Sequence, residues 1–291
     1  MDTPQEFHYR LPGRDSGQRP GAHPGSSIGA GQEFVSHMSL YDRPDPRRLD
    51  LRASLRGLGD DWLVRVNRQR GGASVRAIVD VSASMFFGSR RLKLQVVADF
   101  VEALGLSAFR VGDAVGMMAF DVTERTDLFV PARLSRGMGS LMGAALREVC
   151  DLGANGDAAG HLADGLEDAA SRLAGQQGLV FLVSDFHWPL ERLEAAVDLM
   201  AHAGVVPVVV WDPAETHPPA RNALASLRDA ESGARRTLWL RPKLRRDWSR
   251  AVEQRRTEID SFFAAHAIRP FYVEGAFDAD ALSRYFFEAD R

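Results

Sequence analysis

From Ser74 onward, short apolar runs alternate with longer stretches in which apolar residues recur at helical spacing. The short runs have the length and β-branched content of buried strands: VRAIVDV, AVGMMAFD, TDLFVPA, LVFLVSD, VVPVVVWD and RPFYVEG. Between the first two, Leu94, Val97 and Val101 fall on one face of a predicted helix. This alternation predicts an α/β domain with a doubly wound, mostly parallel central sheet and helices on both faces.

Composition divides the chain into three segments. Residues 1–32 are rich in Gly, Pro, Ser and Arg, so we predict a flexible N-terminal extension. Residues 33–72 form a basic lead-in segment that we expect to pack on the domain. Its interleaved Asp residues favour a solvated face or internal ion pairs over a phosphate-binding patch. Residues 73–291 form the predicted α/β domain, with a β-hairpin insertion whose turn signal is Ser232 and Gly233.

Composition and charge also exclude several classes of protein. The 291 residues are 45% hydrophobic and 26% charged, and the formal net charge of -3 gives no general case for binding nucleic acid. Cys150 is the only cysteine, which excludes an intramolecular disulfide and a thiolate zinc cluster. We find no apolar run long enough for a membrane span and no signal-peptide core, so we expect a cytoplasmic protein. The oligomeric state is not predicted.

Asp80, Ser82 and Ser84 follow the first predicted strand at a spacing of two residues. This spacing lets the carboxylate and both hydroxyls turn toward one point at the carboxyl end of the strand, where open α/β sheets bind ligands. Three oxygen donors suit a hard cation such as Mg²⁺. The alternative is that these residues cap the following helix.

Asp185 ends a second predicted buried strand, about a hundred residues further along. Two parallel strands that each end in an aspartate would bring both carboxylates to one edge of the sheet. Buried like charges are unfavourable unless a cation or hydrogen bonds offset them, so Asp185 strengthens the prediction of a cation site.

The chain resembles the von Willebrand factor A-like domain, and more narrowly the bacterial family often encoded beside MoxR-type AAA+ ATPases. The matching motifs run in order: G-x-G-x-E-F at 29–34, Y-D-R-P-D-P-R-R-L-D at 41–50, D-V-S-A-S-M at 80–85, G-D-A-V-G-M at 112–117, V-S-D-F at 183–186, W-D-P-A-E at 211–215 and R-D-A-E-S-G at 228–233. A further resemblance is to the accessory proteins of bacterial methanol-oxidation clusters.

The resemblance implies a metal-ion-dependent adhesion site. Ser82 and Ser84 would contact the cation through their hydroxyls, and Asp80 and Asp185 would act directly or through water. The expected cation is Mg²⁺, with Mn²⁺ and Ca²⁺ as alternatives.

The fifth ligand of such a site is normally a threonine, and this chain departs from the pattern there. Gly160 falls where the threonine should be, and Ser140 is a second candidate one helix earlier. Asp157 or Asp164 would substitute in an otherwise incomplete site. Asp121, at the end of another predicted strand, is a candidate for indirect contact with the cation.

The implied function is that of a non-enzymatic adaptor, because the cation would keep one position open for an acidic residue of a partner. The implied partners are a MoxR-type AAA+ ATPase, a client enzyme such as methanol dehydrogenase, or both, in maturation or in metal or cofactor assembly. The alternative is a metal-dependent hydrolase or phosphatase. Dehalogenase-like phosphatase chemistry needs an aspartate two residues after the nucleophile, and here that position is Ser82.

Overall fold

The computed structural model describes residues 5–11, 20–29, 33–56, 61–153, 161–218, 224–228, 235–239 and 241–288. Six strands form its central sheet: β4 (Ser74–Asp80), β5 (Ala114–Phe120), β6 (Val130–Arg133), β7 (Leu179–Ser184), β8 (Gly204–Trp211) and β11 (Phe271–Glu274). Their order is β11-β8-β7-β4-β5-β6. Every neighbouring pair is parallel except β5 and β6, which are antiparallel. The predicted mostly parallel sheet is therefore confirmed.

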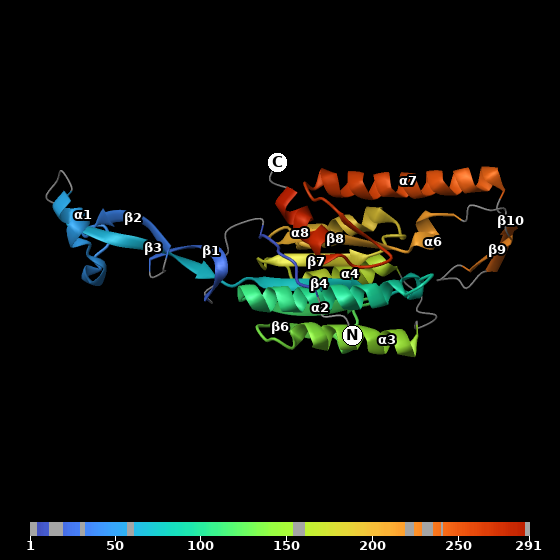
Figure 1. Ribbon diagram of the computed structural model, residues 1–291, viewed down its shortest axis with the longest axis horizontal. Helices are drawn as coiled ribbons and strands as arrows, with labels where there is room; N and C mark the ends of the chain where they lie inside the picture. Colours follow the sequence, from blue (N-terminus) through green and yellow to red (C-terminus); the bar gives the residue numbers. More distant parts are fainter. Residues whose placement is uncertain are drawn as a thin grey trace.

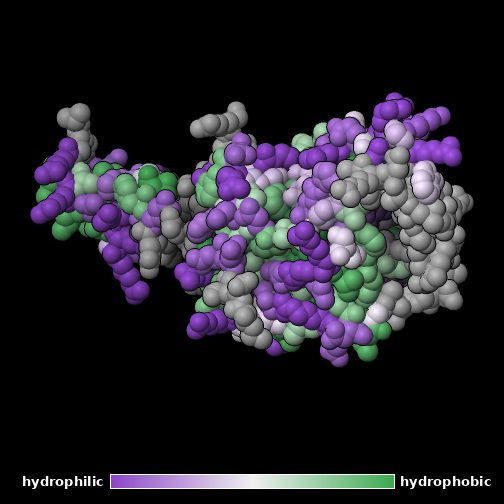
Figure 2. Space-filling model, turned by 45° about the vertical axis from the view of Figure 1, so that its right-hand side comes forward, coloured by the Kyte–Doolittle hydropathy of each residue, from purple (hydrophilic) through white to green (hydrophobic). Residues whose placement is uncertain are grey.

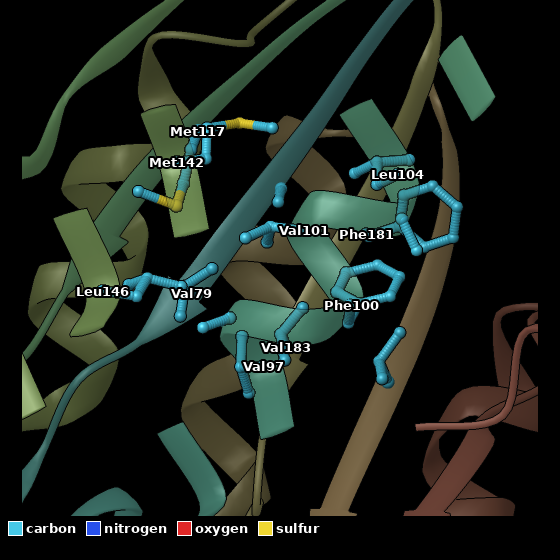
Figure 3. Close-up of a cluster of buried hydrophobic side chains, with 14 of the residues drawn as sticks. Val79, Val97, Phe100, Val101, Leu104, Met117, Met142, Leu146, Phe181 and Val183 are labelled. Carbon is cyan, nitrogen blue, oxygen red and sulfur yellow. The ribbon is translucent and has the colours of Figure 1, made fainter. Parts of the chain in front are cut away.

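Helices cover both faces of this sheet, as Figure 1 shows. One face packs against α2 (Lys93–Val111), α3 (Met138–Leu152) and α8 (Ala279–Glu288), and the other against α4 (Leu162–Ser171), α5 (Leu193–Leu199) and α7 (Pro242–Ala265). Side chains alternate between the two cores, so Val79 joins the α2 side and Ile78 the α4 side. Figure 3 shows Phe181 of β7 facing Phe100 of α2, with ring centroids 5.3 Å apart. The fold is consistent with a von Willebrand A-like architecture.

Short helical elements follow four strands of the central sheet. They are the 3-10 turns η2 (Ala83–Phe86), η3 (Thr126–Leu128) and η4 (Leu190–Arg192) and the helix α6 (Pro213–Thr216). Because η2 follows β4 and α6 follows β8, both lie at the carboxyl ends of parallel strands. At the opposite end of α2, Gly112 ends the helix with φ of 84°, a left-handed conformation that favours glycine.

The predicted β-hairpin is present as a separate two-stranded antiparallel sheet of β9 (Leu224–Arg228) and β10 (Arg235–Trp239). Its register pairs Arg228 with Arg235. The turn signal at Ser232 and Gly233 lies outside the described residues.

The N-terminal region forms a second antiparallel sheet of β1 (Pro20–Gly29), β2 (Glu33–Ser39) and β3 (Leu63–Gly71), in the order β1-β3-β2. The connection from β2 to β3 carries η1 (Pro46–Arg48) and α1 (Leu51–Arg56). Figure 1 shows this sheet projecting from one end of the α/β body. We expected residues 1–32 to be flexible and 33–72 to pack on the domain. In the structure β1 pairs with β3. This pairing satisfies the backbone N–H and C=O groups of β1, although the sequence of β1 has no apolar pattern.

Large apolar side chains are exposed on this N-terminal sheet and on α1. Figure 2 shows apolar surface interspersed with hydrophilic surface on that part of the molecule. The exposed side chains include Phe34, Val35, Met38, Tyr41, Leu51, Leu55 and Trp62.

Residues 5–11 cross the α/β core before the N-terminal sheet begins. Phe7 is buried among aromatic rings, with centroids 6.2 Å from those of Phe100 and Phe181. Part of the predicted extension therefore belongs to the core. None of the described helices has both the length and the apolar content needed to span a membrane.

Candidate functional site

Asp80 and Asp185 lie side by side at the carboxyl edge of the central sheet. Asp80 is the last residue of β4 and Asp185 directly follows β7; these strands are parallel neighbours, with Val79 opposite Val183. Both carboxylates are fully buried. The structure thus brings together the two strand-end acids that the sequence places a hundred residues apart.

The Asp80 carboxylate is held by hydrogen bonds at both oxygens. Its Oδ1 accepts the Ser82 backbone N–H at 2.9 Å, and its Oδ2 accepts the Ser184 hydroxyl at 2.6 Å. Burial, and then the charge of Asp185, raises the pKa of Asp80 to about 6 despite these hydrogen bonds. Burial and the neighbouring carboxylate therefore disfavour the ionised form of Asp80.

Ser82 and Ser84 form a hydroxyl pair beside Asp80, with their Oγ atoms 3.2 Å apart. Ser82 occupies the N-cap position of η2, yet its side chain makes no capping hydrogen bond. Capping of the helical turn that follows, the alternative interpretation of these residues, therefore does not explain the hydroxyl of Ser82.

Lys93 also reaches this site, which our sequence analysis did not predict. The first residue of α2, it places its Nζ 2.7 Å from Asp185 Oδ2 and 2.8 Å from Glu215 Oε1. Its side chain is only 1% exposed. Burial opposes the charged form, but Asp185 and then Glu215 raise the pKa of Lys93 above its ordinary value. The sequence did hold a signal for this contact, because Lys93 begins a strongly apolar helix. A lysine that becomes buried with such a helix needs an acidic partner.

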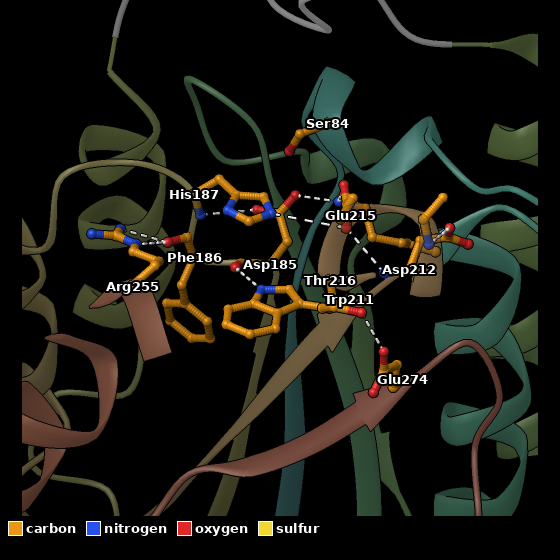
Figure 4. Close-up of polar contacts among 12 residues, drawn as sticks. Ser84, Asp185, Phe186, His187, Trp211, Asp212, Glu215, Thr216, Arg255 and Glu274 are labelled. Atoms are coloured by element: carbon orange, nitrogen blue, oxygen red, sulfur yellow. Dashed lines mark hydrogen bonds and ion pairs between the residues drawn. The ribbon is translucent and has the colours of Figure 1, made fainter. Parts of the chain in front are cut away.

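The pKa of Asp185 moves in the opposite direction from that of Asp80. Burial alone would raise it, but the Lys93 ammonium and then the charge of His187 hold the pKa of Asp185 below its ordinary range. The other oxygen, Oδ1, accepts the His187 backbone N–H at 3.1 Å. The indole Nε1 of Trp211 donates to the Asp185 carbonyl at 2.9 Å, so its backbone is also fixed (Figure 4).

Glu215 is oriented by the start of α6. Its Oε2 accepts the Asp212 backbone N–H at 2.9 Å, and the Asp212 side chain in return accepts the Ala214 N–H at 2.8 Å. Asp212 Oδ2 also accepts the Ser89 backbone N–H at 2.9 Å, which joins this loop to the segment before α2. The start of α6, which carries Glu215, is thus connected to the segment that leads into Lys93.

Arg255 of α7 supports the loop that follows Asp185. Its Nε donates to the Phe186 carbonyl at 2.9 Å, and its Nη2 donates to the same carbonyl (Figure 4). The Nη2 also donates to the Trp188 carbonyl. Phe186 has a φ of 51°, a strained conformation for a residue other than glycine. Such strain persists where surrounding contacts over-determine the backbone, as they do here.

The other predicted residues lie in different settings. Asp121 follows β5 and accepts the Thr123 backbone N–H at 3.0 Å while pairing with Arg125 at 3.4 Å. Ser140 is exposed near the start of α3, and Asp164 is exposed on α4 beside Arg192. Asp157 and Gly160 lie outside the described residues. Gly160 is the position where we expected the threonine of such a site, so that position is not described.

The hydroxyl pair fits a divalent cation. Adjacent oxygens around octahedral Mg²⁺, at metal distances of about 2.0–2.1 Å, are roughly 3 Å apart, close to the Ser82–Ser84 separation. Over the described part of the chain, no three His, Cys, Asp or Glu side chains form a group able to hold a metal. A cation here would therefore rely on the serine hydroxyls and on water, with Asp80 and Asp185 behind them.

Comparison with known proteins identifies uncharacterised relatives. "Uncharacterized protein Rv1480" of Mycobacterium tuberculosis and "Uncharacterized protein Mb1516" of Mycobacterium bovis are each 27% identical over 187 residues, or 62% of this chain. The match covers 56% of each relative, so the chain spans little more than half their length.

Solved structures are more distant. An aerotolerance-related membrane protein from Bacteroides fragilis matches with 14% identity over 75% of this chain and 98% of its own, at a TM-score of 0.42. The PilB minor pilin from Streptococcus sanguinis matches with 10% identity over 80% of this chain and 65% of its own, at a TM-score of 0.39.

A family model matches residues 44–258, which is well over half of the chain. The chain therefore belongs to the family described as "Protein of unknown function DUF58".

Proposed function

We propose that this chain is a non-enzymatic docking module that receives an acidic residue of a partner protein at the carboxyl edge of its sheet. The observation that carries this proposal is the hydroxyl pair of Ser82 and Ser84, 3.2 Å apart, placed beside two fully buried carboxylates. Ordinary strand-to-helix connections need only a cap, and Ser82 makes no side-chain capping bond.

In this proposal Ser82 and Ser84 hold a divalent cation, with Mg²⁺ expected and Mn²⁺ or Ca²⁺ as alternatives. Asp80 and Asp185 supply negative charge, directly or through water. When bound, the cation would supply an open coordination position for a carboxylate oxygen. The chain's own residues orient the hydroxyls. The Ser82 backbone N–H donates to the Asp80 carboxylate and fixes the first turn, and the Ser184 hydroxyl donates to Asp80 and fixes its side chain.

The proposed partners are a MoxR-type AAA+ ATPase, a client enzyme such as methanol dehydrogenase, or both. Their cytoplasmic encounter would serve maturation or metal or cofactor assembly of the client. This part of the proposal is supported by the motifs at 80–85 and 183–186, which resemble those of the MoxR-associated family.

The geometry favours docking over a hydrolase that uses Asp80 as nucleophile. Asp80 is fully buried, and each of its oxygens already accepts a hydrogen bond. A nucleophilic carboxylate needs an oxygen within reach of a substrate atom.

Calorimetric titration of the full chain with Mg²⁺, Mn²⁺ and Ca²⁺ tests the cation site. We expect saturable binding that a Ser82→Ala/Ser84→Ala variant loses and that Ser261→Ala, an exposed serine on α7, retains. Binding undiminished in the double variant would overturn the proposed ligand set.

Docking is tested separately by fluorescence anisotropy with a labelled peptide containing a single glutamate. We expect binding that requires the divalent cation and disappears when the peptide glutamate is replaced by glutamine. Binding that survives chelation would show a docking surface that works without a cation bridge.

A further inference from the structure

Lys93 is an unusual choice for its position. Lys93 and Lys243 are the only lysines in the sequence, and every other cationic residue apart from histidine is an arginine. Lys243 is exposed on α7, whereas Lys93 is buried between two carboxylates. A lysine ammonium is a compact point charge on a flexible stem, while an arginine guanidinium is a planar fork that holds a carboxylate at two points. The buried position thus carries a lysine, whose ammonium moves more readily from one acceptor to another than a guanidinium does.

The Lys93 ammonium lies where it would repel a metal ion bound to Asp185. It is 2.7 Å from Asp185 Oδ2, while Asp185 Oδ1 accepts the His187 backbone N–H. A divalent cation that used Asp185 would share this small carboxylate with a second positive charge. The two cations would repel each other at close range in a buried setting, where screening by water is weak.

Glu215 gives Lys93 a second acceptor, 2.8 Å from the same Nζ. Glu215 does not depend on Lys93 for its position, because its other oxygen accepts the Asp212 N–H in the capping box of α6. It is also partly exposed, whereas Asp185 is fully buried. The lysine can therefore release Asp185 and remain paired, without leaving an uncompensated buried ammonium.

We propose that Lys93 is a built-in competitor for the divalent cation, holding Asp185 in the cation-free state and staying on Glu215 when the cation takes Asp185. This inference rests on the proposed function, because it assigns the Lys93 ammonium a role in the same cation site. The exchange lowers the affinity for the cation while keeping Asp185 paired in the cation-free state.

The exchange also couples the cation to the partner. A partner carboxylate adds negative charge on the cation side of the site and none on the Lys93–Glu215 side. It therefore favours the state in which the cation has displaced the lysine from Asp185. Cation and acidic partner should each bind more tightly in the presence of the other.

The test is calorimetric titration of the full chain with Mg²⁺, comparing wild type with Lys93→Met, Glu215→Gln and the exposed-lysine control Lys243→Met. We expect Lys93→Met to bind Mg²⁺ about tenfold more tightly, equivalent to ~1.4 kcal/mol. Glu215→Gln should bind more weakly than wild type, because Lys93 then has only Asp185 as its charged acceptor. Lys243→Met should match wild type.

Circular dichroism accompanies each titration, because Lys93→Met removes the partner of a buried carboxylate. If that variant is unfolded without cation, Glu215→Gln decides the matter, since it keeps the Lys93–Asp185 pair. Unchanged or tighter Mg²⁺ binding by Glu215→Gln would then overturn the exchange.

The outcomes separate this inference from the proposed function. Equal affinities for wild type and a folded Lys93→Met, each lost on Ser82→Ala/Ser84→Ala, would overturn the competition and leave the cation site standing. Binding by Lys93→Met alone would support the competition and overturn the metal bridge in the native chain. No binding by any folded variant would overturn both.

Discussion

The Tyr9 hydroxyl donates a 2.5 Å hydrogen bond to Asp113 Oδ2, linking residues 104 positions apart in the sequence. Asp113 is fully buried; its other oxygen accepts the Ala73 backbone N–H at 2.7 Å, and His23 Nε2 lies 2.7 Å from Oδ2. One carboxylate therefore joins the N-terminal segment, strand β1, the entry to β4 and the entry to β5. Burial, followed by the charge of Asp113, raises the pKa of Tyr9, so its hydroxyl remains a donor.

Tyr9→Phe should lower the free energy of unfolding by roughly 1.5–3 kcal/mol, the usual range for a hydrogen bond to a charged group. The aromatic packing of the ring is kept, so the change isolates the hydroxyl. Urea denaturation measures the effect, and Tyr41→Phe, at a side chain 88% exposed, serves as the matched control. Equal stability of Tyr9→Phe and wild type would show that Asp113 does not depend on this donor.

Asp80→Asn should stabilise the cation-free protein at pH 7 by about 1–3 kcal/mol while removing cation binding. The folded protein holds the Asp80 proton more tightly than the unfolded chain, because its pKa is about 6 against an ordinary value of 3.8. Ionised Asp80 therefore opposes folding above pH 6, and this cost disappears as the pH falls toward 4. The stability advantage of Asp80→Asn should shrink over the same interval.

Denaturation in the presence of a chelator, at intervals from pH 4 to pH 7.5, measures this advantage. Asp247→Asn makes the same chemical change at an exposed position on α7 and should show no comparable trend. A variant less stable than wild type at pH 7 would contradict the sign of the predicted effect.

Gly105→Ala should destabilise the packing of α2 on α3. A Cβ at Gly105 would lie 2.2 Å from the Cα of Gly139, so the two helix backbones must separate. Overpacking of this kind typically costs about 1–3 kcal/mol, which outweighs the gain of up to ~1 kcal/mol from the better helix propensity of alanine. Chemical denaturation checks the prediction. Gly137→Ala is the control, because nothing lies within 4 Å of its Cβ position.

Arg255→Met should loosen the loop after Asp185. The three backbone acceptor contacts of Arg255 are lost, while methionine keeps much of the apolar stem. We expect faster amide hydrogen exchange from Phe186 to Trp188, and a reduction in unfolding free energy of roughly 1–3 kcal/mol. Arg250→Met, at an exposed position on the same helix, should leave both quantities within error. Unchanged exchange in Arg255→Met would show that the loop holds its strained Phe186 without this support.

Local pattern was sufficient for much of the fold and part of the site. The apolar runs that end in Asp80 and Asp185 predicted buried parallel strands, and parallel strands present their carboxyl ends on one edge. That rule placed both acids on one edge of the sheet, and the pairing of β4 with β7 then made them neighbours. The pairing of β1 with β3 could not be predicted in this way, because the residues of β1 lack an apolar period and the two strands are held by backbone hydrogen bonds.

The sequence by itself determined the α/β class, the hairpin and the residues that meet at the end of β4, because side-chain periodicity and spacing are properties of neighbouring residues. Only the tertiary structure decided that Lys93 pairs with Asp185 and Glu215, 92 and 122 positions away, and that Tyr9 reaches Asp113. These contacts depend on strand order and on how helices sit against the sheet. The partner of a buried charge is chosen by distance in space, which local sequence does not encode.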